Sequence, residues 1–202
     1  MSESQFATKF MGAAAAGDIE ALQQCIEQGV DINVRGKARR TAVLNAAMND
    51  QLEAVEFLIG TGADIDLQDE TNFNPFLYGC INGKLELVKM MIRANPNLDL
   101  LTRFGGVGLT PACEKGHVEV VRELLTTTNI NVNHTNFLGW TPLIEAITLN
   151  DGGSKQQEII KLLIEYGANI QMTDEYGVTP LELARRKGYT EIEQILLQAG
   201  AK

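Results

Sequence analysis

The feature that most constrains the fold is a phrase that returns at a fixed interval along the chain. Six glutamates stand in similar surroundings: Glu20, Glu53, Glu86, Glu119, Glu158 and Glu191. The first four are each 33 residues apart, and the block around them reads like residues 17–22, Gly-Asp-Ile-Glu-Ala-Leu. A constant period of this size indicates a solenoid, in which each unit buries its apolar face against its neighbours.

Two further phrases keep the same register. About twelve residues after the glutamate comes a glycine-containing turn with a short expected strand, at residues 29–33, 62–66 and 167–170. Glycine suits the left-handed position that closes a helix. Upstream of the glutamate, a short helix is expected to open at Thr41, Asn74, Thr141 and Thr179, three of them followed by proline. Threonine caps a helix, and proline fits the first turn.

These phrases together resemble the ankyrin repeat family, and the resemblance extends over nearly the whole chain. It implies an all-α fold, an ankyrin-type solenoid of six stacked helix-turn-helix repeats joined by β-hairpin loops. We expect a single ankyrin repeat domain at 1–202, with repeats at approximately 3–35, 36–68, 69–101, 102–135, 136–173 and 174–202.

Two places break the repeat. In the fourth repeat Thr110-Pro111 lies three positions late, which predicts a short first helix that starts at Thr110. In the fifth repeat residues 150–157 add about five residues to the turn, and their Gly-Gly-Ser composition indicates a loop. Because lengthening a loop costs only a logarithmic entropy term, we expect this insertion to be dispensable for folding.

The composition of the chain limits the classes of binding partner and the cellular compartment that we expect. The chain has 17 basic and 26 acidic residues, a net charge of -9, which disfavours nucleic acid as a partner. No stretch has the roughly 20 apolar residues that a membrane span needs, so no membrane partner is expected. Three cysteines are an odd number and fit a reducing compartment, which favours the cytoplasm. The apolar residues 10–16 are too short and too alanine-rich for a signal peptide.

The residues that could take part in catalysis, metal binding or phosphate binding are better explained by structural roles. Cys80 and Cys113 are 33 residues apart and occupy the same small-residue position, so both are predicted to be buried. His117 lies in a turn between helices, and no histidine stands at zinc-ligand spacing from a cysteine. Residues 105–108, Gly-Gly-Val-Gly, lack the lysine of a phosphate loop. We therefore expect no catalysis, cofactor or metal.

In proteins similar to this family, the hairpin tips and the first helices form one concave surface that is not needed for stacking. An aromatic residue appears at four consecutive tips, and exposed aromatics often dominate binding energy. The alternative is that Phe73, Phe137 and Trp140 fold back between the hairpins. The predicted partner-binding residues are Lys37, Arg40, Phe73, Tyr78, Arg103, Phe104, Phe137, Trp140 and Tyr176.

The basic cluster of Arg35, Lys37, Arg39 and Arg40 is unusual in an acidic chain. It is either a solvated tip or a site that attracts an acidic segment of a partner. The predicted function is therefore that of a monomeric module that binds a protein or peptide. The alternative is an inhibitor or immunity protein that blocks an enzyme. A small-ligand binder would need a closed pocket, of which the sequence shows no sign.

Overall fold

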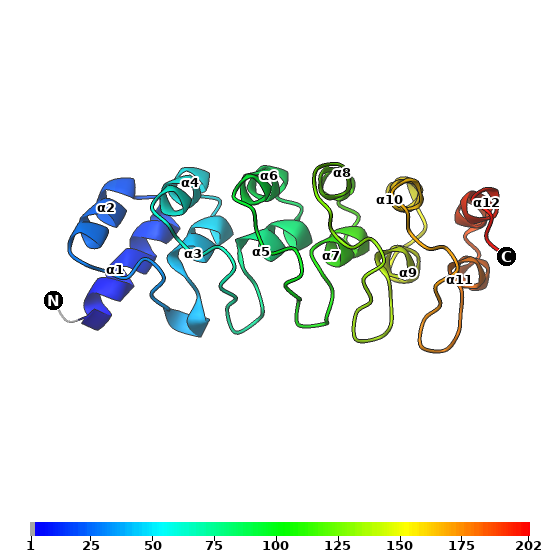
Figure 1. Ribbon diagram of the computed structural model, residues 1–202, viewed down its shortest axis with the longest axis horizontal. Helices are drawn as coiled ribbons and strands as arrows, with labels where there is room; N and C mark the ends of the chain where they lie inside the picture. Colours follow the sequence, from blue (N-terminus) through cyan, green and yellow to red (C-terminus); the bar gives the residue numbers. More distant parts are fainter. Residues whose placement is uncertain (1–2) are drawn as a thin grey trace. The chain divides into compact units, whose positions relative to one another are not determined.

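The computed structural model describes the backbone of residues 3–202 and the side chains of residues 5–202. Within this part of the chain there are twelve α-helices and one short 3-10 turn, and no strand (Figure 1). The elements are α1 (Glu3–Ala16), α2 (Ile19–Glu27), η1 (Lys37–Arg39), α3 (Ala42–Met48), α4 (Leu52–Gly60), α5 (Pro75–Asn82), α6 (Leu85–Arg93), α7 (Leu109–Glu114), α8 (Val118–Thr127), α9 (Pro142–Thr148), α10 (Ser154–Glu165), α11 (Pro180–Lys187) and α12 (Thr190–Gln198).

The first helix of a repeat begins where its capping residue predicts. The Thr41 hydroxyl accepts a hydrogen bond from the Leu44 N–H, and Thr141 and Thr179 cap α9 and α11 in the same way. Asn74 replaces the threonine before α5, and its Oδ1 accepts the Leu77 N–H at 2.8 Å. These bonds satisfy backbone donors that have no partner inside the helix, which confirms the predicted helix starts.

Two local expectations differ from the structure. The segments expected to be strands form turns, in which an aspartate or asparagine accepts the N–H two residues later; Asp64 Oδ1, for example, accepts the Asp66 N–H at 2.9 Å. Such local bonds compete with the hydrogen bonds of a strand ladder. In the fourth repeat, α7 is short as predicted, with six residues, but it begins at Leu109 rather than at Thr110.

The helices belong to two compact units. The first comprises residues 1–79 and 86–97. In it α1 contacts α2 and α3, and α3 contacts α4. Its core contains fully buried apolar side chains from both helices of each pair: Phe10, Leu22, Leu44, Leu58, Phe76, Leu77, Val88 and Met91.

The second unit comprises residues 80–85 and 98–202. Its helices pair as α7 with α8, α9 with α10 and α11 with α12, and α9 also contacts α7 and α11. Cys80 and Cys113 are fully buried, as predicted. The His117 ring nitrogen Nε2 lies 3.1 Å from the Ile81 carbonyl oxygen, and the ring covers Gly83, where a side chain would collide with it. His117 thus joins two inter-helix turns, which agrees with a structural role.

The insertion in the fifth repeat is packed rather than free, which favours a contribution to stability over the dispensability for folding that the sequence predicts. Only residues 149–153 are loop, because α10 already begins at Ser154. The Tyr189 hydroxyl donates to the Asn150 carbonyl, and the buried Gln156 side chain donates to Asn150 Oδ1 at 2.8 Å. Gly152, at φ 74°, lies on the Tyr189 ring so closely that a Cβ would be 2.7 Å from it.

We expect deletion of residues 151–155 to destabilise the protein by about 2 kcal/mol. The deletion removes the contact of Gly152 with the Tyr189 ring and displaces Asn150, to which Tyr189 and Gln156 both donate. Thermal unfolding followed by circular dichroism should show Tm lower by about 4–8 °C for a chain of this length. Tyr189→Phe, which removes only the hydroxyl, should cost about 1 kcal/mol. An unchanged Tm in the deletion variant would mean that the segment does not dock.

Candidate functional site

Five loops that precede first helices share one register, and we call them tips 1 to 5. Tips 1 and 2 (residues 36–40 and 69–73) lie in the first unit, and tips 3, 4 and 5 (residues 102–106, 136–140 and 174–178) lie in the second. Within each unit the tips project from the helices as long loops (Figure 1). The first residues of the five tips are Gly36, Asp69, Thr102, Asn136 and Asp174.

The first side chain of a tip holds the loop in shape, and Asp69 in tip 2 shows how. Its Oδ1 accepts the Thr71 N–H at 2.8 Å, the Thr71 hydroxyl at 2.7 Å and the Phe73 N–H at 3.0 Å. Its Oδ2 lies 3.4 Å from Arg40 Nε. Burial by itself raises the pKa of Asp69, but the hydrogen bonds from Thr71, Phe73 and Arg40 together bring its pKa below the ordinary value.

The same arrangement recurs in the second unit. Asn136 Oδ1 accepts the N–H groups of Leu138 and Trp140, and Asp174 Oδ1 accepts those of Tyr176 and Val178. In tip 3 the shorter Thr102 accepts only one, from Gly106 N at 3.2 Å. In tips 2 to 5 one buried or half-buried side chain organises the loop, so most of the other side chains of the tip are free to face solvent.

Three of these free side chains are aromatic and lie at successive tips of the second unit. We call Phe104, Phe137 and Tyr176 the tip aromatics; they are 67%, 74% and 79% exposed. Tips 3 and 4 are joined by a hydrogen bond from Phe137 N to the Phe104 carbonyl, 3.1 Å long, and the Phe137 ring lies over Gly105. The Arg103 guanidinium stands 5.0 Å from the centre of the Phe104 ring. These rings are exposed while their backbone is held in place.

The other two predicted tip rings are packed. Phe73 is half-buried and meets Tyr78 edge to face, with ring centres 6.3 Å apart. Trp140 is half-buried too, and its Nε1 is buried with no acceptor among the described residues. Both rings occupy the fifth position of their tips, directly before the capping residue of the next helix, so the expected row of exposed rings at four tips is limited to the tip aromatics. A partner-binding role for Phe73, Tyr78 and Trp140 stays a prediction.

Sequence reasoning missed Glu145, a carboxyl group buried in α9. It is 6% exposed, and the Asn136 side chain donates to its Oε1 at 2.6 Å, which ties tip 4 to the helix. Burial and the nearby Glu114 raise the pKa of Glu145 to about 7, against the opposite effects of Asn136 and Lys115. The sequence signal that could have indicated this contact is the position of Glu145, four residues after the capping Thr141. A residue at that spacing lies on the same side of α9 as its cap, near tip 4.

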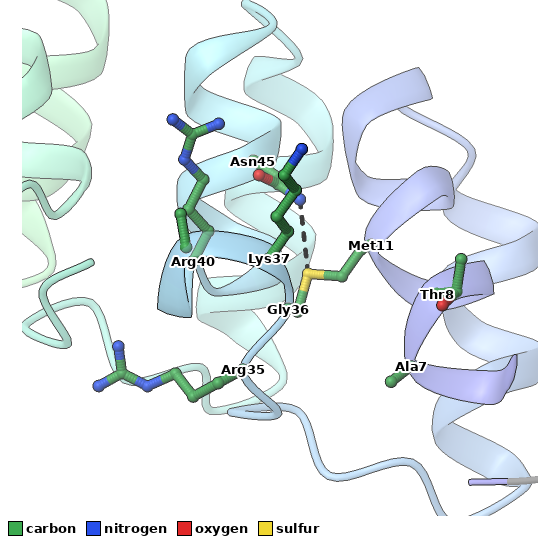
Figure 2. A pocket seen from close by; sticks show the side chains of 9 residues that line it. Ala7, Thr8, Met11, Arg35, Gly36, Lys37, Arg40 and Asn45 are labelled. Carbon is green, nitrogen blue, oxygen red and sulfur yellow. Dashed lines mark hydrogen bonds between the residues drawn. The ribbon is translucent and has the colours of Figure 1, made fainter. Parts of the chain in front are cut away.

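A pocket of about 650 Å³ lies in the first unit between α1, tip 1 and α3. Figure 2 shows Lys37 and Arg40 on tip 1, Arg35 just before it, and Met11 beside Asn45, whose amide donates to the Met11 sulfur. Arg35 donates to the carbonyls of Arg39 and Gln68, and Lys37 has no ion pair within residues 5–202. No acidic residue lines the pocket, which consists of Ala7, Thr8, Met11, Arg35, Gly36, Lys37, Ala38, Arg40 and Asn45.

We also searched the described residues for metal sites, reactive thiols and membrane-spanning helices. Among them, no group of three or more His, Cys, Asp or Glu side chains is arranged to hold a metal ion. Burial raises the pKa of the Cys80 and Cys113 thiols, so both stay protonated at neutral pH. Residues 3–202 also contain no helix with the length and apolar character required to cross a membrane.

Paired helices with tip loops in one register define a helical repeat protein. The family model described as "Ankyrin repeats (3 copies)" matches residues 10–103, 82–174 and 109–202. The chain therefore belongs to the ankyrin repeat family. The crystal structure of an ankyrin repeat domain from Acinetobacter baumannii AYE is similar, with a TM-score of 0.91 and 41% identity over 96% of this chain and 98% of the other.

Curated relatives match part of the chain. The ankyrin repeat protein YahD of Escherichia coli (strain K12) is 63% identical over 82 residues, which are 41% of this chain and 41% of YahD. Protein phosphatase 1 regulatory subunit 27 of Homo sapiens is 35% identical over 83 residues, 41% of this chain and 51% of that protein. The chain thus spans between 41% and 51% of the length of these relatives.

Proposed function

We propose that this chain is a protein-protein interaction module that binds a protein or peptide partner through its tips. The observation that carries the proposal is the exposure of the tip aromatics on a backbone held by Thr102, Asn136 and Asp174. Large rings carried on an ordered backbone give binding energy with less loss of conformational entropy on association than rings on a flexible loop, and aromatic residues dominate many interfaces. The ankyrin repeat family supports the same function, since its fold is a scaffold for partners and not a catalytic one.

The proposed binding surface includes further predicted residues. In the second unit Arg103 adds a positive charge beside the Phe104 ring. In the first unit the predicted residues are the cations Lys37 and Arg40 and the half-buried rings of Phe73 and Tyr78. Trp140 adds the exposed part of its half-buried ring. The module acts as a monomer in the cytoplasm in this proposal, a location that the odd number of cysteines supports.

A second candidate function is regulation of an enzyme by direct binding. It is favoured by the similarity to a protein whose name describes a regulatory subunit of protein phosphatase 1. The same tips would then cover part of an enzyme surface. An assay of the activity of the captured partner, with and without this protein, distinguishes an inhibitor from a passive scaffold.

We expect the triple variant Phe104→Ala, Phe137→Ala, Tyr176→Ala to lose at least about 100-fold in affinity, since each ring of an interface centre contributes about 1–2 kcal/mol or more. Affinity capture with the wild-type chain, followed by quantitative mass spectrometry and titration of the captured partner, measures this loss. The matched control is Tyr166→Ala with Leu197→Ala, two large exposed side chains outside the tips, the first directly after α10 and the second on α12. Equal capture by the triple variant, with an unchanged circular dichroism spectrum, would refute the proposal.

A further inference from the structure

Tip 1 differs from the other four tips in its first residue. Gly36 stands where tips 2 to 5 have Asp69, Thr102, Asn136 and Asp174, so no side-chain oxygen of the tip's own can accept the loop N–H groups. In tips 2, 4 and 5 the N–H of the third residue is bound by that oxygen. The equivalent Ala38 N–H has no acceptor among the described residues.

Backbone conformation does not require glycine at this position. Gly36 has φ -86°, which any residue adopts, and a Cβ there would meet only the flexible Met11 side chain, with Cγ at 3.0 Å. The strain lies instead in the next residues, because Ala38 and Arg39 both have φ 56° without being glycine. Such conformations are costly for residues with a Cβ and are concentrated at functional sites.

Gly36 and Ala38 both line the 650 Å³ pocket, so the position without a side-chain oxygen and the residue whose N–H has no acceptor border the same space. Three cationic residues, Arg35, Lys37 and Arg40, line this pocket. In Figure 2 Lys37 lies beside Asn45, whereas the guanidinium groups of Arg35 and Arg40 point away from Ala7 and Met11. Only Arg40 has an acidic partner there, the buried Asp69 of tip 2, at 3.4 Å. Among the described residues Arg35 and Lys37 have no ion pair, so these two cations leave a local positive charge in a chain whose net charge is -9.

We propose that this pocket binds the carboxylate of an acidic peptide segment, which takes the place that the first side chain occupies in the other tips. The carboxylate accepts the Ala38 N–H, as Asp69 accepts the Thr71 N–H, and lies in the field of Lys37, Arg35 and Arg40. Ala7 and Met11 contact the aliphatic stem of the same side chain. The proposal rests on the proposed function and specifies the chemistry of the partner at this end of the module.

The test is an NMR titration of the isotope-labelled full chain with the peptide acetyl-(Glu)6-amide, with acetyl-(Gln)6-amide as the uncharged control. We expect the Ala38 amide signal to shift with the glutamate peptide alone, and less at about 0.5 M salt than at about 0.05 M. Gly36→Asp supplies an internal carboxylate and should abolish the shift. Lys37→Gln should weaken binding about two- to fivefold, and Lys161→Gln, on α10, should leave it unchanged.

No shift at Ala38 with the glutamate peptide, or an equal shift in folded Gly36→Asp protein, would overturn the inference. Titration with inorganic phosphate separates carboxylate recognition from general anion binding: an equal shift at the same concentration would also overturn it. Failure here is distinct from failure of the proposed function. The triple variant of the tip aromatics should still bind the glutamate peptide, and Gly36→Asp protein should still show partner capture through those aromatics.

Discussion

Replacing Glu145 with glutamine should stabilise the protein above pH 7 relative to the wild type, by up to about 3 kcal/mol. The pKa of Glu145 is raised from 4.5 to about 7 in the folded state, because burial and Glu114 disfavour its charge. Between these two values the unfolded chain binds fewer protons than the folded chain. The free energy of unfolding therefore falls as pH rises, by about 1.4 kcal/mol per pH unit for this group. Glutamine keeps an acceptor for Asn136 and carries no charge.

Urea unfolding at several pH values measures this effect as the difference between Glu145→Gln and the wild type. That difference should increase from pH 4.5 to about 7 and then stay constant, since the carboxyl group is ionised in both states at higher pH. Glu165→Gln, at an exposed position on α10, is the control and should show no such trend. A pH-independent difference for Glu145→Gln would show that the carboxyl group ionises normally in the folded protein.

Replacing Asp69 with alanine should destabilise the first unit by about 3 kcal/mol. Asp69 is 5% exposed as a residue, and its carboxylate accepts three hydrogen bonds from Thr71 and Phe73. Its removal leaves the backbone donors of tip 2 without their acceptor and Arg40 without its ion partner, and each lost hydrogen bond costs about 1 kcal/mol. Chemical unfolding of the variant and the wild type at neutral pH gives the difference.

Asp69→Asn is the matched control, because Asn136 performs the same task in tip 4 with an amide oxygen. It should retain the backbone hydrogen bonds and cost about 1 kcal/mol, chiefly for the weaker pairing with Arg40. If Asp69→Ala is as stable as Asp69→Asn, the hydrogen bonds that the side-chain oxygen accepts are not what holds the tip.

The repeat, its helices and their caps were predictable from the sequence, since they depend on contacts between residues close in the chain. Thr41 caps α3 through Leu44, only three residues away, and the 33-residue period places Cys80 and Cys113 at equivalent buried positions. Short-range hydrogen bonds and a periodic apolar face leave signals that can be read without knowing the tertiary structure. The start of α7 was missed by one residue, because Thr110 looks like a cap but is buried inside the helix.

The candidate site depended on contacts between residues far apart in the chain, which spacing does not reveal. The sequence shows an aromatic at four tips, but only packing decides that Phe104, Phe137 and Tyr176 face solvent while Phe73 and Trp140 are half-buried. Likewise, the segment at 150–157 reads as a free loop, yet Tyr189, 39 residues beyond Asn150, binds it. Local preferences determined the helices of this protein; the stacking of repeats decided which side chains are buried, which titrate abnormally and which remain free to bind.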